Sequence, residues 1–344
     1  MLKAEPIPKL WSERIVEKTR LPRWIAGFVV FVLPFVILDP AVGYALGIWE
    51  PFFLKVELPQ YSFNVPFLLL CYYASSYFRA RTSALKEHCV AMGVTGDARL
   101  DLSGMGKSSR IAVLFIVLFS TFIPIYVMYG VGDFTFVQRV LAASIPYSYF
   151  LLVLATFVWA YGYSMYSIFK MGRLPLKLKA HTEDSMLGLR PFGAASLRLT
   201  AVFLTFIFFG VLPASISPDL YGLTSAGAEI FLGALVIVMA VCSLGLFFLP
   251  LTSLRRQLLH ARRTELAWIA PIRTDLLTKM RSSGPAGPEK DVLDEYNSLG
   301  GVERDARQIH TWPFDVNLFA RLLAIILSVS AIILSRLVAN FLKI

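Results

Sequence analysis

One segment limits the possible folds of this chain more than any other: Leu141–Phe169 contains 29 consecutive residues without a charged side chain. As a single α-helix with a rise of ~1.5 Å per residue, the segment would be ~43 Å long, which exceeds the ~30 Å hydrocarbon core of a bilayer. Uncharged runs of this length are typical of helices that span a membrane. We therefore expect this segment to cross a membrane, either tilted or with one end protruding.

Six other apolar segments also have the length of a membrane span, and polar segments separate them. They lie at 24–46, 61–78, 111–128, 199–216, 230–254 and 318–341. Only 16% of the residues in the chain are charged, whereas soluble domains have about 25%. The sequence therefore predicts an all-α, polytopic integral membrane protein with seven transmembrane helices.

The distribution of basic residues predicts how these helices are oriented. Lys and Arg number six in each of the segments 1–23, 79–110 and 170–198 and ten in 255–317, which together hold 28 of the 33 in the chain. Loops rich in Lys and Arg stay on the cytoplasmic side of a membrane. We therefore expect a cytoplasmic N-terminus and an extracytoplasmic C-terminus.

This orientation divides the chain into four parts. The helical spacing of apolar residues near Trp11 predicts a short interfacial helix in the first part. In chain order, the parts are a cytoplasmic interfacial arm (1–23), a six-helix transmembrane region (24–254) with cytoplasmic loops at 79–110 and 170–198, a cytoplasmic helical segment (255–317) and the seventh transmembrane helix (318–344).

The formal net charge of +10 comes from the basic segments that set the orientation of the chain in the membrane. It also predicts attraction to the lipid bilayer. Basic residues near a membrane surface each gain about 1 kcal/mol from anionic lipid. We therefore expect anionic lipid as a partner at the cytoplasmic face, with a multi-pass location in the plasma membrane. A nucleic-acid partner is not needed to explain the charge, and none is expected.

Polar and aromatic side chains form a stripe along the 29-residue segment. At helical spacing, Tyr149, Thr156 and Tyr163 share one face and Trp159 lies beside them, while Tyr73 belongs to a similar polar group in the second span. Such residues either line a polar path or join helices through hydrogen bonds. The first alternative predicts a channel or facilitator with a hydroxyl- and aromatic-lined path, as a single chain or a homo-oligomer.

Three charged residues fall within the apolar runs, Asp39, Arg321 and Arg336, and the first and last of them are candidate site residues. Asp39 has two interpretations. It is a cation-coordinating or gating carboxylate, because an ionisable group near hydrocarbon is costly and is usually functional. Alternatively, it marks the end of the first helix, because a residue before proline disfavours the helical conformation. We favour the helix end. Arg336 is expected near the outer headgroups, and a position facing a pore is the alternative.

Enzymatic activity is not expected from this sequence. The expected spans contain no His, Glu or Lys and no paired carboxylates. The four histidines have no spacing that places two ligands on one helical face, so neither a metal site nor another cofactor is expected. The alternative to a channel is a membrane-anchored receptor or scaffold that docks a cytoplasmic partner through residues 255–317.

Overall fold

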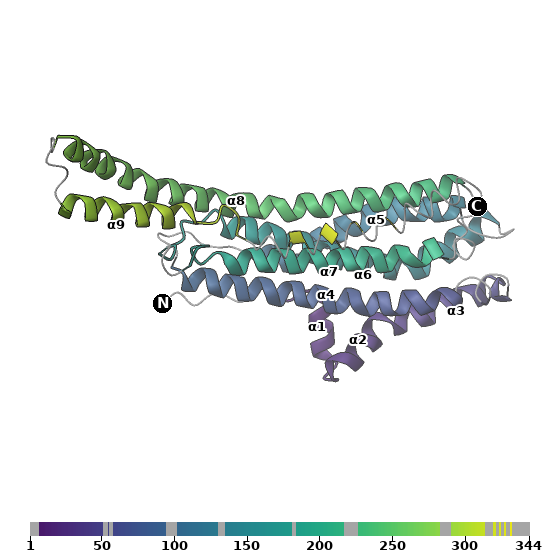
Figure 1. The fold of residues 1–344 in the computed structure, drawn as a ribbon. Helices are drawn as coiled ribbons and strands as arrows, with labels where there is room; N and C mark the ends of the chain where they lie inside the picture. Colours follow the sequence, from purple (N-terminus) through teal and green to yellow (C-terminus); the bar gives the residue numbers. More distant parts are fainter. Residues whose placement is uncertain are drawn as a thin grey trace.

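The computed structural model shows a bundle of long helices that run side by side (Figure 1). The residues that it describes contain helices and no strand. These residues are 7–50, 54, 58–93, 102–129, 135–180, 184–216, 226–282, 290–313 and six positions between 319 and 331.

The helix α6 (Phe136–Met171) is the centre of the bundle. It packs against α3, α4, α5 and α8, so it touches more neighbours than a peripheral helix would. Thr135 caps its first turn: the Thr135 hydroxyl accepts a hydrogen bond from the Gln138 backbone N–H at 3.3 Å, and the Gln138 side chain accepts one from the Thr135 N–H at 3.1 Å. The other bundle helices are α3 (Leu33–Ala45), α4 (Leu58–Ala91), α5 (Ser108–Tyr129), α7 (Arg190–Ile216) and α8 (Ala226–Ser282).

Three helical segments in the described residues are long and apolar enough to cross a membrane. They are Arg23–Ala45, Ser108–Ile125 and Phe136–Met171. The described part of the chain therefore shows three spans and not the seven expected from the sequence. The second expected span, 61–78, is helical within α4, but its tyrosine, serine and asparagine side chains make it less apolar.

The other expected spans are described only in part. The side chains of 207–216 in the fifth span and of 230–240 in the sixth lie outside the described residues. Most of the seventh span, 318–341, also lies outside them, and so does Arg336.

Several helices continue beyond the point where the charged residues begin. Residues 79–91, expected to be part of a loop, instead extend α4, and residues 190–198 begin α7. Likewise α8 does not end at Arg255 but continues to Ser282. Arg, Lys and Glu are good helix formers, so a cluster of them indicates polar surroundings rather than the end of a helix.

The first expected span is bent, but not at Asp39. The bend separates α2 (Arg23–Phe31) from α3 at Val32, and Pro34 is the second residue of α3. Proline has no N–H, so the carbonyl four residues earlier, that of Val30, loses its helical partner. Pro40 lies inside α3, which continues to Ala45, and the expected helix end at Asp39 is therefore wrong.

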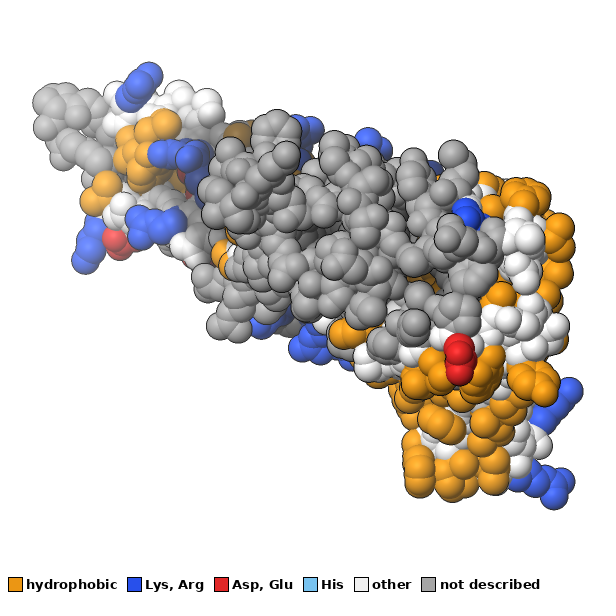
Figure 2. Space-filling model, turned by 90° about the vertical axis from the view of Figure 1, so that its right-hand side faces the viewer, with side chains coloured by type: hydrophobic (Ala, Val, Ile, Leu, Met, Phe, Trp, Pro, Cys, Tyr) orange, Lys and Arg blue, Asp and Glu red, His pale blue; other side chains and the backbone are white. Residues whose placement is uncertain are grey.

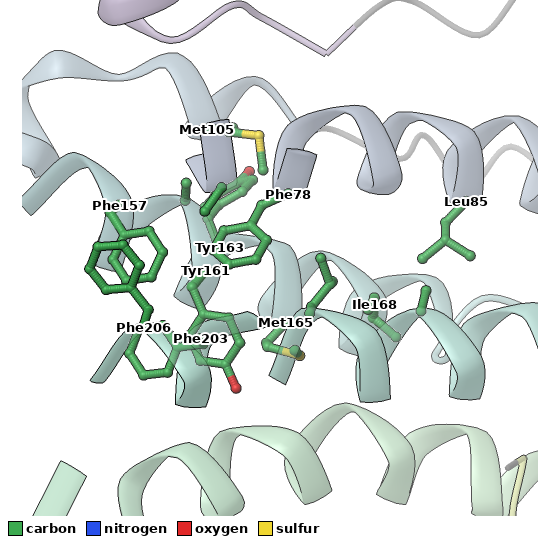
Figure 3. Close-up of a cluster of buried hydrophobic side chains, with 14 of the residues drawn as sticks. Phe78, Leu85, Met105, Phe157, Tyr161, Tyr163, Met165, Ile168, Phe203 and Phe206 are labelled. Carbon is green, nitrogen blue, oxygen red and sulfur yellow. The ribbon is translucent and has the colours of Figure 1, made fainter. Parts of the chain in front are cut away.

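Aromatic side chains from α4, α6 and α7 fill the centre of the bundle (Figure 3). Tyr161 stacks on Phe203 with ring centroids 4.0 Å apart, and Phe157 stacks on the same ring at 5.3 Å. Tyr161 lies ~38 Å along α6 from Phe136, which is more than the ~30 Å hydrocarbon thickness. The packed core therefore extends along α6 for more than the thickness of a hydrocarbon layer.

Candidate functional site

The polar stripe of α6 contacts segments that precede it in the chain. The Tyr149 hydroxyl donates a hydrogen bond to the Val30 carbonyl of α2. This is the carbonyl that Pro34 deprives of its helical donor, so the tyrosine satisfies a backbone group that would otherwise lack its partner in the helix. Tyr149 thereby fixes the position of the bend between α2 and α3.

The next residue of the stripe, Thr156, holds α1 (Trp11–Lys18). The Trp11 indole Nε1–H donates a hydrogen bond to the buried Thr156 hydroxyl oxygen at 2.7 Å. The same hydroxyl donates to the Leu152 carbonyl at 2.9 Å, as expected for a threonine within a helix. Both its donor and its acceptor capacity are thus in use.

The last two residues of the stripe hold the short helix η2 (Ser103–Gly106). Trp159 Nε1–H donates to the Met105 carbonyl at 3.2 Å, and the Tyr163 hydroxyl accepts from the Gly104 N–H at 3.1 Å. A Cβ atom at Gly104 would lie 2.7 Å from the Tyr163 ring, so the close approach requires glycine there. Together, the four stripe residues form a binding surface for segments of the same chain that precede α6.

A buried ion pair adds to this contact between α1 and the bundle. Glu13 is buried, and one of its carboxylate oxygens lies 2.6 Å from Nε of Arg79 on α4. The same carboxylate accepts a hydrogen bond from the Leu10 N–H at 3.0 Å. The helical spacing around Trp11 indicates α1, but no local pattern shows that Arg79 and Thr156 are its partners.

The second acidic residue of α1 is paired at the surface. The carboxylate of Glu17 lies 2.6 Å from the Lys9 ammonium group. The hydrogen bond from Lys9 lowers the pKa of Glu17 below its ordinary value, because it favours the charged carboxylate. Both acids of α1 are therefore engaged with basic side chains.

Asp39 is buried in the interior of α3, where 2% of its surface is exposed. The Tyr61 hydroxyl of α4 donates a hydrogen bond to the Asp39 carboxyl at 2.8 Å. The Phe35 ring, one helical turn earlier, packs against Tyr61 at 5.6 Å and against Tyr147 of α6 at 6.0 Å. A carboxyl group held in such apolar surroundings is costly unless it is paired, so Asp39 is a candidate functional group within the first span.

The remaining expected site residues do not join this arrangement. Tyr73 is 42% exposed and its ring lies 5.2 Å from that of Tyr72 on the outside of α4, whereas the stripe is on α6. Among the described residues, no group of three His, Cys, Asp or Glu side chains is placed to hold a metal ion. His88 instead lies within hydrogen-bond distance of the Gly188 carbonyl, at 3.2 Å.

A second region of interest is the hairpin of α8 and α9 (Lys290–Arg307), which extends beyond the bundle (Figure 1). Arg273 of α8 binds two residues of α9: its guanidinium lies 2.5 Å from the Glu303 carboxylate and donates to the Tyr296 hydroxyl at 3.1 Å. The hydrogen bond to Tyr296 and the nearby Glu303 charge raise the pKa of Arg273. Between the helices, Ile269 and Leu276 are buried.

The base of the hairpin is attached to the bundle. The His310 N–H donates to the Ser185 carbonyl at 3.0 Å, and the Arg255 guanidinium lies 4.5 Å from the centre of the Trp312 ring. A cation over an indole face is attracted to the negative face of the ring. The chain that leaves α9 therefore returns to the point where α8 leaves the bundle.

The hairpin exposes apolar side chains of α8 that α9 does not cover. Trp268 is 45% exposed and Ile272 is 38% exposed, and their spacing of four residues places them on one side of the helix. Residues 255–282 contain seven basic and two acidic residues. This part of α8 is therefore predominantly basic as a whole, with Trp268 and Ile272 exposed on one side of it.

Comparisons with protein-family models, with curated protein sequences and with solved structures find no match to this chain. The arrangement of its residues is thus the basis for a functional interpretation. It offers an intramolecular binding surface on α6, a buried carboxyl group at Asp39 and a projecting hairpin with exposed apolar side chains.

Proposed function

We propose that this protein is a membrane-anchored receptor or scaffold that docks a cytoplasmic protein through the α8–α9 hairpin. The observation that carries the proposal is the continuity of α8, a single helix from Ala226 to Ser282. Trp268 lies ~20 Å beyond Arg255 along this helix, and Ile272 lies ~26 Å beyond it. Both are then too far from the bilayer to contact lipid, which makes a protein the fitting partner.

The topology that accompanies this function has seven membrane crossings. The three apolar helices of the described residues support a membrane location, and the basic segments support a cytoplasmic N-terminus and an extracytoplasmic C-terminus. In this topology the hairpin is cytoplasmic and lies between the sixth and seventh spans. The plasma membrane is the location we propose.

The chemistry of the hairpin defines the partner. Trp268 and Ile272 share one side of α8 with charges of both signs. Glu265 accepts a hydrogen bond from the Trp268 indole at 2.9 Å, and Lys279 pairs with Asp275 at 2.8 Å. A complementary surface has apolar side chains at its centre and polar side chains around them. We therefore propose a protein with an apolar contact region as the partner.

The first test places a photoreactive amino acid in the full-length chain in its native cells. With the probe at Trp268 or at Ile272, we expect a discrete adduct between this chain and a second protein. With the probe at Thr274 we expect none, because this exposed residue lies on a different side of the same helix. Replacing Ile272 with glutamate should reduce the adduct from the probe at Trp268 several-fold, since it places a charge in the apolar contact region.

Two outcomes would overturn the proposal. Equal labelling from Thr274 would mean that the contact is nonspecific. An adduct with twice the mass of the chain and no other product would mean that the surface joins two copies of this protein, as in a homo-oligomer.

A channel or facilitator is the second candidate, and the buried Asp39 favours it. A carboxyl group inside a span is often part of a solute or ion path. In liposomes that contain the purified chain, a facilitator would speed the influx of glycerol or potassium, and Asp39→Asn would change that influx several-fold, whereas Tyr73→Phe would not. Influx equal to that of empty liposomes for all three proteins would exclude this candidate for these solutes.

A further inference from the structure

We propose that the N-terminal arm, residues 10–31, is a binding surface for acidic phospholipid headgroups at the cytoplasmic face of the membrane. The arm consists of α1, the turn at 19–22 and α2, which is the cytoplasmic end of the first span in the proposed topology, and it projects sideways from the bundle (Figure 1). This function is independent of the hairpin, which lies farther from the membrane.

Two contacts place α1 at the cytoplasmic surface of the bilayer. Trp11 binds Thr156, which lies ~30 Å along α6 from Phe136. Glu13 pairs with Arg79, which lies ~32 Å along α4 from Leu58. Phe136 and Leu58 begin their helices at the extracytoplasmic end in the proposed topology, so both distances equal about one hydrocarbon thickness of ~30 Å.

One side of the arm packs on the bundle and the other is apolar and exposed. On the packed side, Phe31 is buried and stacks on Tyr72 with centroids 4.6 Å apart. On the exposed side, Leu21 and Phe28 are well exposed and Trp24 is 68% exposed. Figure 2 shows hydrophobic side chains gathered over the projecting lobe, with Lys and Arg at its edge. Tryptophan and basic residues in this arrangement are typical of a surface that lies in the membrane interface.

The charges of the arm favour an acidic lipid over a zwitterionic one. Glu13 and Glu17 are paired with Arg79 and Lys9. Four exposed basic residues of the arm have no ion pair within the described part of the chain. They are Arg14, Lys18, Arg20 and Arg23. Anionic headgroups attract such residues when they lie near the membrane surface. A second copy of the chain is a poorer occupant, because a symmetric contact would bring these like charges together.

The backbone of the turn supports a role for the Arg20 side chain. Arg20 has φ +56°, in the left-handed region that glycine adopts without strain. An arginine at this position is conformationally less favourable than glycine, and strained positions of this kind are often retained for function. If the Arg20 guanidinium binds a lipid headgroup, the presence of arginine instead of glycine at this turn position is explained.

The test measures thermal unfolding of the purified full-length chain in detergent. We expect a higher unfolding midpoint with added phosphatidylglycerol than with the same amount of phosphatidylcholine. The triple variant Lys18→Gln, Arg20→Gln, Arg23→Gln should lose most of this difference. The matched control replaces Lys177, Lys290 and Arg304, which are exposed far from the expected membrane surface, with glutamine and should keep it.

The variant Arg20→Gly separates lipid binding from a structural role of the turn. We expect its unfolding midpoint in phosphatidylcholine to equal or exceed that of the wild type, because glycine relieves the strain, while the gain from phosphatidylglycerol falls. Three results would overturn the proposal: the triple variant keeps the difference, the matched control loses it equally, or the arm variants convert a dimer to a monomer without changing the lipid response.

Discussion

Replacing Tyr161 with alanine is expected to lower the free energy of unfolding by about 3–5 kcal/mol, the cost of removing a large aromatic side chain from a packed core. The Tyr161 ring is fully buried and stacks on Phe203 at 4.0 Å, and its hydroxyl lies 3.1 Å from that of Thr200. The cavity would open in the aromatic core between α4, α6 and α7. Denaturant unfolding of the purified protein in detergent measures the loss.

Tyr161→Phe is the matched control for this prediction. It keeps the ring and removes only the hydroxyl, so the loss should be about 1 kcal/mol, the usual net value of one hydrogen bond. If the alanine and phenylalanine variants were equally unstable, the hydrogen bond to Thr200 rather than the aromatic packing would stabilise this part of the core.

Replacing Arg79 with glutamine is expected to cost about 3 kcal/mol and to release α1 from the bundle. The substitution leaves the Glu13 carboxylate buried without its ionic partner, and breaking a buried pair on one side is more costly than removing both charges. Amide hydrogen exchange should accelerate in Trp11–Lys18 while exchange in the centre of α6 stays slow.

The double variant Glu13→Gln, Arg79→Gln tests the cause. With no buried charge left, we expect it to recover a large part of the stability lost in Arg79→Gln. If the two substitutions were instead additive, the contact between Glu13 and Arg79 would contribute no coupling energy, and the hydrogen bond from Trp11 to Thr156 would have to hold α1 in place.

The sequence predicts the helical architecture well, because membrane helices are recognisable from local properties. The uncharged run from Leu141 to Phe169 corresponds to α6, the central helix, and the spacing near Trp11 corresponds to α1. Helix ends are predicted less well. At Arg79 and Arg255 the side chains change from apolar to charged while the backbone stays helical, so composition shows a change of surroundings and not of structure.

The candidate site is harder to predict because its contacts join distant parts of the chain. Helical spacing places Tyr149, Thr156 and Tyr163 on one face, but Thr156 finds its partner Trp11 at a separation of 145 residues. No local pattern contains that contact. At Asp39 the local rule is itself misleading. The rule for residues before proline predicts a helix end, whereas α3 packs against α6, Asp39 accepts a hydrogen bond from Tyr61 of α4, and the helix continues.

The continuity of α8 has a mechanical consequence. In the proposed topology, α8 enters the bilayer at one end and continues ~40 Å past Arg255, so it would act as a lever. A change in bilayer thickness that tilts its membrane half by ~10° would swing the far tip by roughly 7 Å, since spanning helices tilt to match the hydrocarbon around them. Pro250 and Pro271 interrupt the hydrogen bonds of α8 and are the two points where such a lever would flex.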